Sequence, residues 1–160
     1  MIYRGGFNDK NDKQYILDIV IDDGDTAIVP LELGGKPFET EMDNSDETIY
    51  QPVKYQGATI GLLAFEEDYK FNLYSATAKH AKVILYDEDD YVYWTGYITP
   101  SLYDIGYEAR YEDLDVDCID GLSILKYKIF EPYEVDTTVP LLAIIIRMLR
   151  YVDCYKYLYV

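Results

Sequence analysis

Histidine and cysteine, the side chains that most often bind transition metals or form nucleophilic pairs, are scarce in this chain. His80 is the only histidine, which excludes a metal site built from several imidazoles. Cys118 and Cys154 are the only cysteines, which favours a reduced, intracellular origin over a disulfide framework. Cys118 alternates with apolar residues along a predicted strand, where a thiol packs in a core, so a nucleophilic pair with His80 is disfavoured.

The acidic stretch "DEDD" at residues 87–90 has the charge of a calcium-binding loop. An EF-hand loop, however, requires a polar ligand at its fifth position and glycine at its sixth. Counted from Asp87, these two positions hold Tyr91 and Val92. We therefore interpret residues 87–90 as a solvated hairpin loop and predict neither a metal site nor a cofactor.

A second acidic stretch, "FEED" at residues 65–68, offers neighbouring carboxylates. Glu66 and Glu67 follow one another on a predicted strand, so their side chains point to opposite faces and do not converge as a glycosidase pair does. The sequence also lacks the glycine-rich loops of nucleotide-binding proteins and the nucleophile motif of serine hydrolases. We expect a protein without catalytic residues, with a hydrolase as an open alternative.

The composition limits the partners that the chain can bind. Its 160 residues suffice for one domain, and an apolar content of 49% excludes a disordered acidic tail. A net charge of −16 disfavours binding to phosphate backbones and to anionic lipid surfaces. The longest apolar run, residues 139–146, is far shorter than the roughly 20 residues that span a bilayer. The N-terminus lacks the apolar region of a signal peptide, so we expect no membrane insertion.

Alternating apolar residues predict the strands on which any functional side chains would lie. In residues 14–23, one face of a predicted strand carries Tyr15, Leu17, Ile19 and Ile21. Residues 27–33 continue as a second strand after a glycine-containing turn, which predicts an N-terminal hairpin. Pro30 marks that second strand as an edge strand or a bulge.

Further strands are predicted at residues 58–68, at residues 82–86 and 91–99 on either side of the acidic loop, and at residues 111–119. The last of these alternates most regularly, with Leu114, Val116 and Cys118 against Asp113, Asp115 and Asp117. One buried and one solvated face are typical of an antiparallel sheet or a barrel wall. The sequence therefore predicts a β-rich α+β fold, an antiparallel barrel or sandwich with C-terminal helices.

The stretch "YVYWTGYITP" at residues 91–100 separates into two faces if it is a strand. Its even positions predict a core face, made of Val92, Trp94, Gly96 and Ile98. Its odd positions predict an outward face, and tyrosine is common at interfaces because its ring is apolar and its hydroxyl tolerates water. With 19 tyrosines in the chain, we predict interface residues at Tyr91, Tyr93, Tyr97, Tyr103 and Tyr107. A carbohydrate platform remains the alternative.

The pattern becomes helical towards the C-terminus. Asp120 is a suitable N-cap for a short helix with Leu122 and Leu125 one turn apart. Thr138 is a suitable cap for a second helix, whose apolar positions from Leu141 to Val152 follow helical spacing. We therefore expect a β-rich domain at residues 1–119 and a helical segment at residues 120–160.

The order of these motifs resembles the N-terminal part of bacteriophage tail hub or baseplate proteins. The similarity covers roughly residues 46–152 as a succession of weak motifs: "DETIYQPVKYQGATIGLL", "YWTGYITPSLYDIGYE", "CIDGLSILKY" and "TVPLLAIIIRMLRYV". The family pattern is an aromatic-x-Gly-aromatic strand followed by an Asp-Gly-Leu-x-x-Leu helix start. It falls on Trp94, Gly96, Tyr97, Asp120, Gly121, Leu122 and Leu125.

The resemblance implies a structural protein of the virion, built on a tail-tube-like β-domain. Family members form rings, often trimers, so the implied partners are copies of the chain itself and other tail proteins. DNA would pass through such a ring without specific binding, and acidic walls would favour this by repelling phosphates. Family hubs are much longer than this chain. The main alternative is a carbohydrate-binding β-domain, such as the receptor-binding module of a tail.

Overall fold

The computed structural model describes residues 1–21, 25–42, 56–64, 77, 79–99, 112–128 and 139–152. Its strands are β1 (Ile2–Asn8), β2 (Gln14–Ile21), β3 (Ile28–Pro30), β4 (Glu39–Met42), β5 (Gln56–Ala64), β6 (Ala81–Asp87), β7 (Val92–Ile98) and β8 (Glu112–Asp120). They form one eight-stranded sheet in the order β3-β1-β2-β6-β7-β8-β5-β4. A 3-10 helix η1 (Ser123–Tyr127) and an α-helix α2 (Leu141–Tyr151) follow. The predicted β-rich class is confirmed, with a single α-helix towards the C-terminus and a 3-10 helix where the first helix was predicted, and the sheet is not closed into a barrel.

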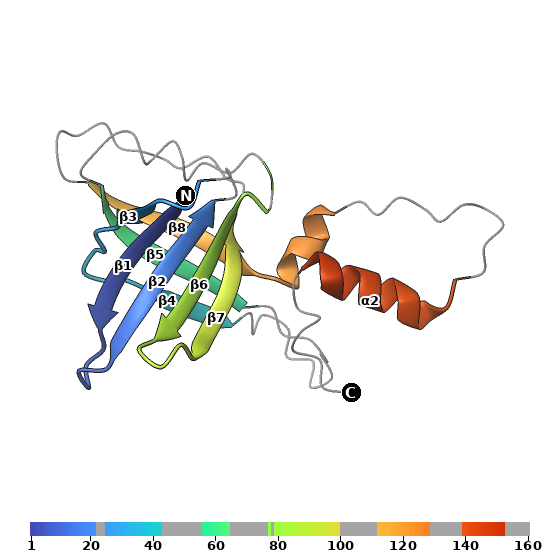
Figure 1. Cartoon of the computed structure of the whole chain (residues 1–160), viewed down its shortest axis with the longest axis horizontal. Coiled ribbons are helices and arrows are strands. Elements are labelled where there is room, and N and C mark those ends of the chain that lie inside the picture. Colours follow the sequence, from blue (N-terminus) through green and yellow to red (C-terminus); the bar gives the residue numbers. More distant parts are fainter. Residues whose placement is uncertain are drawn as a thin grey trace.

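Among the described residues, the sheet curls around its largest buried apolar cluster. Figure 1 shows β1, β2, β6 and β7 lying across from β8, β5 and β4. Alternating residues point inward from both halves, so their side chains form one buried cluster that includes Leu17, Ile19, Ile60, Leu62, Val83 and Val116. The chain after β3 approaches the other half at an isolated bridge between Leu33 and Leu62. Burial of this shared face is the main force that holds the two halves together.

The predicted N-terminal hairpin is wrong in its pairing. β2 pairs antiparallel with β1, with Ile2 opposite Val20, and β3 pairs parallel with β1, with Ile2 opposite Ile28. β6 occupies the other edge of β2, so β3 adds to the remaining edge of β1. The expected faces are nevertheless correct, because Leu17, Ile19 and Ile21 are buried. Pro30 lies in a terminal strand of the sheet, as predicted.

The hairpin around the acidic loop and the alternation of the last strand are both confirmed. β6 and β7 pair antiparallel on either side of the loop. In β8, Leu114, Val116 and Cys118 are buried, whereas Asp115 and Asp117 are exposed. The predicted strand continuation at residues 65–68 lies outside the described residues.

The two predicted faces of β7 need two corrections. The register shifts where Leu85 is opposite Trp94 and Tyr86 is opposite Val92, which leaves Tyr93 as the extra residue of a bulge. Val92 is therefore 41% exposed instead of lying in the core. Tyr97 does lie on the odd face, but it is only 2% exposed because the C-terminal segment covers it.

The C-terminal segment packs against the outer side of β7 and β8. Tyr97, Ile124 and Val152 form a second buried cluster there, and Figure 1 shows η1 and α2 beside this part of the sheet. The predicted helix is confirmed at Leu141–Tyr151, directly after Pro140, whereas its predicted cap Thr138 lies outside the described residues. The predicted division into residues 1–119 and 120–160 stays a prediction. In the part of the chain that the structure describes, no helix has the length and apolar character needed to cross a membrane.

Candidate functional site

The predicted site residues fall into two groups along β7. Tyr91 and Tyr93 belong to the first, at the end of the sheet where the β1–β2 and β6–β7 turns lie; we call it the tip. The second is the β7–β8 joint, which contains the predicted family-motif residues Trp94, Gly96, Tyr97, Asp120, Gly121, Leu122 and Leu125. Tyr103 and Tyr107 lie outside the described residues.

The β1–β2 turn is shaped by Asp9. Its Oδ1 accepts hydrogen bonds from the backbone N–H of Asn11 at 2.7 Å and of Lys13 at 3.0 Å. These backbone hydrogen bonds, the one from Lys13 first, lower the pKa of Asp9. Asp12 adopts a left-handed backbone conformation with φ of 61°, which aspartate tolerates better than most residues. The turn therefore holds Lys13 at the start of β2.

The β6–β7 turn is built in the same way around Asp87. Its Oδ1 accepts hydrogen bonds from the backbone N–H of Asp89 at 3.1 Å and of Tyr91 at 3.0 Å. Asp90 is left-handed, with φ of 59°. Asp87 continues the inward face of β6 and is only 4% exposed, so the prediction that it is solvated is wrong. The prediction is correct for residues 88–90, which are exposed.

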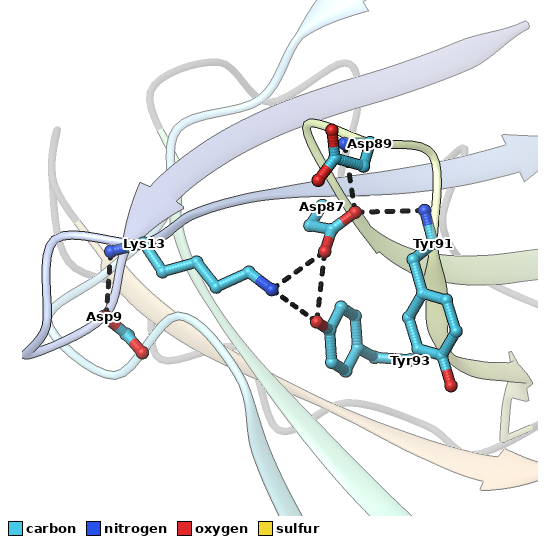
Figure 2. Close-up of polar contacts among 6 residues, drawn as sticks. All are labelled: Asp9, Lys13, Asp87, Asp89, Tyr91 and Tyr93. Carbon is cyan, nitrogen blue, oxygen red and sulfur yellow. Dashed lines mark hydrogen bonds and ion pairs between the residues drawn. The ribbon is translucent and has the colours of Figure 1, made fainter.

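Lys13, Asp87 and Tyr93 join the two turns (Figure 2). The Lys13 ammonium lies 2.8 Å from Oδ2 of Asp87 and donates a hydrogen bond of 2.5 Å to the Tyr93 hydroxyl. The Tyr93 hydroxyl in turn donates to Oδ2 of Asp87 at 3.0 Å. The bulge makes this triangle possible, because it turns Tyr93 towards the face on which Asp87 lies.

The charges of this triangle are held fixed. The hydrogen bond from Lys13, supported by the Tyr91 N–H and the Tyr93 hydroxyl, lowers the pKa of Asp87 from 3.8 to about 2, although desolvation opposes this. The hydrogen bonds to Asp87 and Tyr93 raise the pKa of Lys13. Neither group exchanges a proton near neutral pH, so the pair is unsuited to general acid–base catalysis.

Aromatic rings form a row across the tip. Phe7 stacks on Tyr15 with ring centroids 5.6 Å apart, and Tyr15 meets the edge of Tyr93 at 5.3 Å. Tyr91 continues the row with an edge contact to Tyr93 at 5.0 Å. The Lys13 ammonium lies 4.8 Å from the centroid of Tyr93. Tyr91 is 64% exposed and Tyr93 is 45% exposed, so the end of this row faces solvent.

The β7–β8 joint depends on a close approach at Gly96. Gly96 is opposite Asp120 in the sheet. A Cβ atom at Gly96 would lie 2.2 Å from Cη2 of Trp94 and 2.3 Å from the carbonyl oxygen of Ile119, so only glycine fits without displacement. The buried Trp94 ring also meets Phe38 edge-on at 5.5 Å.

Asp120 connects three elements at this joint. Its Oδ2 accepts a hydrogen bond from the Gln56 N–H at 2.8 Å, at the start of β5. Its Oδ1 accepts one from the Ser123 N–H at 2.7 Å, at the start of η1. The N-cap residue of η1 is nevertheless Leu122, so the predicted N-cap at Asp120 is wrong by two positions. Gly121 is buried in the intervening turn, and Leu122 and Leu125 pack against the Tyr97 cluster. The predicted motif residues therefore lie on both sides of this junction, with Trp94 in the inner core and Tyr97, Leu122 and Leu125 in the outer cluster.

Sequence patterns miss two polar networks. Nothing in the sequence singles out Lys13, although the alternation of Ala81, Val83 and Leu85 could have placed Asp87 on the inward face. On the opposite face of the sheet, Arg4 contacts Asp18 through two hydrogen bonds of 2.7 Å. The Tyr86 hydroxyl donates to Asp18 at 3.0 Å, and burial chiefly raises the pKa of Tyr86.

The described residues contain no group of three or more histidine, cysteine or acidic side chains arranged to hold a metal ion. Cys118 is buried as predicted, and this burial raises the pKa of its thiol, which opposes formation of the nucleophilic thiolate.

The chain matches no protein-family model, no curated protein and no solved structure.

Proposed function

We propose that this chain is a non-catalytic structural component of a bacteriophage tail, of the tail hub or baseplate class. It assembles with copies of itself into a ring at the end of the tail tube, contacts other tail proteins and allows DNA to pass. The observation that carries this proposal is the meeting of the family-motif residues at the β7–β8 joint. Residues that are well separated in sequence are in contact there, as expected of a motif with a structural role.

Contacts at the joint explain why particular motif positions hold these residue types. Gly96 makes room for the Trp94 ring and for the Ile119 carbonyl, while Asp120 holds β5 and η1. Tyr97 provides the surface on which η1 and the end of α2 pack. These contacts require only shape and hydrogen bonding, which favours a building block over an enzyme.

The curled sheet supports the finer fold assignment that we propose, a barrel- or sandwich-like domain similar to that of tail tubes. Its two halves enclose one core, and the chain after β3 reaches β5 through the Leu33–Leu62 bridge. Hydrogen bonds from the Gly34 N–H to the Gly61 carbonyl and from the Leu63 N–H to the Glu32 carbonyl strengthen this approach. A tube-like domain needs such curvature in order to enclose its core.

The distribution of charge supports a role beside DNA. Asp115 and Asp117 are exposed on β8, and the acidic loop at residues 88–90 is exposed at the tip. With a net charge of −16, such surfaces repel phosphates and let DNA slide past without being held. We propose that acidic faces of this kind line the passage through the ring.

Two observations test the proposed function. Native mass spectrometry of the purified full chain should reveal a discrete ring of identical subunits, and the gene should lie beside genes for tail-tube and tape-measure proteins. Antibodies against the chain should also label one end of the tail in phage particles that contain it. A chain that stays monomeric at all concentrations, from a gene without tail genes beside it, would contradict the proposal.

A further inference from the structure

We propose that the exposed pair Tyr91 and Tyr93, with the acidic turn beside it, docks an arginine- or lysine-bearing segment of a partner protein. This inference deepens the proposed function and rests on its premise that the chain works through protein contacts. It adds the location of one contact surface and the chemistry of the partner. The surface is the tip, and the recognised group is a cation seated on a tyrosine ring.

The two rings are presented to solvent in a fixed arrangement. They meet edge to face with centroids 5.0 Å apart and an interplanar angle of 73°. Figure 2 shows the Tyr91 ring extending away from the Asp87 carboxylate, while the Tyr93 hydroxyl points towards it. Tyr91, which is 64% exposed, therefore offers the accessible ring of the row. Exposed tyrosines of this kind are frequent anchors at protein interfaces.

The charge around these rings is complementary to a cation. The two turns carry the ammonium groups of Lys10 and Lys13 against the carboxylates of Asp9, Asp12, Asp87, Glu88, Asp89 and Asp90. Lys13 is already paired with Asp87, so the remaining exposed carboxylates of the turn that leads into Tyr91 are those of residues 88–90. A negative rim next to an aromatic ring attracts a basic side chain and repels nucleic acid and acidic segments.

The tip already contains an internal example of the proposed contact. The Lys13 ammonium lies 4.8 Å from the centroid of Tyr93 and 5.6 Å from that of Tyr15, with Asp87 as its counter-ion. Tyr91 is the next ring in the same row, and Glu88, Asp89 and Asp90 are the carboxylates of its own turn. A partner cation on Tyr91 would thus make the kind of ammonium-on-ring contact that Lys13 makes with Tyr93 within the chain.

The turn is also ordered before a partner arrives. The Asp87 carboxylate accepts the backbone N–H groups of Asp89 and Tyr91, and the Tyr93 hydroxyl donates to the same carboxylate. Binding therefore orders little additional backbone, which lowers its entropic cost. An apolar segment would bury the tyrosines but leave the neighbouring carboxylates without a partner, so the basic segment fits the surface better.

The test is a nuclear magnetic resonance titration of the 15N-labelled full chain. The probe is an eight-residue peptide of alternating arginine and glycine, and its matched control has citrulline in place of arginine. We expect the arginine peptide to shift the amide signals of residues 88–93 and the citrulline peptide to leave them unchanged. Tyr91→Ala should weaken binding about 2- to 5-fold, as expected for one exposed cation–π contact.

Two double variants test whether binding depends on the carboxylates of the tip or on the negative charge of the whole chain. The double variant Glu88→Gln and Asp89→Asn should weaken binding and reduce its dependence on salt. The control double variant Asp115→Asn and Asp117→Asn removes two exposed carboxylates from β8 and should leave binding unchanged. The amide spectrum of each variant reports directly whether its fold is retained.

Three results would overturn the inference: equal weakening by both double variants, signal shifts centred on β8 or spread over the surface, or equal binding of the citrulline peptide. Binding of a neutral oligosaccharide at Tyr91 and Tyr93 in place of the arginine peptide would assign the tip to carbohydrate instead. Ring assembly is measured separately by native mass spectrometry. If the chain forms a ring but the peptide does not bind at the tip, only this inference is rejected. If the peptide binds at the tip but no ring forms, the proposed function is rejected.

Discussion

The Lys13 ammonium and the Asp87 carboxylate form an ion pair of 2.8 Å that ties the β1–β2 turn to the β6–β7 turn. The pair is possible because β2 and β6 are neighbours in the sheet, with Tyr15 opposite Asp87. Asp87 lies at the end of the inward face of β6, where an unpaired carboxylate would be costly. The lysine therefore allows a charged residue to close one end of the core.

The first prediction concerns the acid sensitivity of this ion pair. The pKa of Asp87 is lowered from 3.8 to about 2 in the folded chain. Its stabilising contribution is therefore complete above about pH 4 and is lost as the pH falls towards 2. Asp87→Asn should lower the free energy of unfolding near neutral pH and flatten its decline between pH 4 and 2. Urea unfolding followed by the fluorescence of Trp94, the only tryptophan, measures both effects. Equal pH dependence in both proteins would show that Asp87 is not the responsible group.

The second prediction concerns the space above Gly96. Gly96→Ala should destabilise the fold by about 1–3 kcal/mol or more, since its methyl group would overlap a buried ring and a backbone carbonyl. Gly6→Ala in β1 is the matched control, because its methyl group would come no closer than 3.7 Å to any atom outside its immediate neighbours. Chemical unfolding of the two variants should therefore separate clearly. Similar stabilities would indicate that the Trp94 ring does not lie over Gly96.

The third prediction concerns Trp94 itself. Trp94→Ala should cost about 3–5 kcal/mol, as expected for removal of a large buried ring. Trp94→Phe should cost less, because it keeps an aromatic ring near Phe38 and removes Nε1, a buried donor without a hydrogen-bond partner among the described residues. Circular dichroism during urea unfolding measures both variants without the tryptophan signal. Wild-type stability of Trp94→Ala would mean that the core face of β7 is assigned incorrectly.

The fourth prediction distinguishes two tyrosines that the strand pattern places on the same face. Tyr97→Ala should destabilise the fold by about 3 kcal/mol, because it leaves a cavity against Ile124 and Val152. Tyr91→Ala should change stability by less than about 0.5 kcal/mol, since its ring is largely exposed. Thermal unfolding by calorimetry measures the difference. A Tyr97 variant as stable as the Tyr91 variant would contradict the packing of the C-terminal segment on β7.

The residues within single strands and helices could largely be assigned from the sequence. Local spacing correctly predicts the buried faces of β2 and β8, the β6–β7 hairpin and the helix at Leu141–Tyr151. Side chains alternate with period 2 in a strand and repeat every 3.6 residues in a helix, whatever the rest of the chain does. The errors lie where one element meets another, at the partner of β2, at Val92 and at Tyr97.

The candidate site, too, could be predicted from the sequence only in part. The sequence shows tyrosines and carboxylates concentrated in residues 87–97, without a familiar catalytic motif beside them. The burial of Asp87 against Lys13, and of Tyr97 but not Tyr91, becomes visible in the folded chain alone. This is because strand order, the bulge at Tyr93 and the position of the C-terminal segment depend on contacts between distant residues. Those contacts bury apolar area contributed by residues from all parts of the chain. The spacing of neighbouring residues in the sequence does not reveal them.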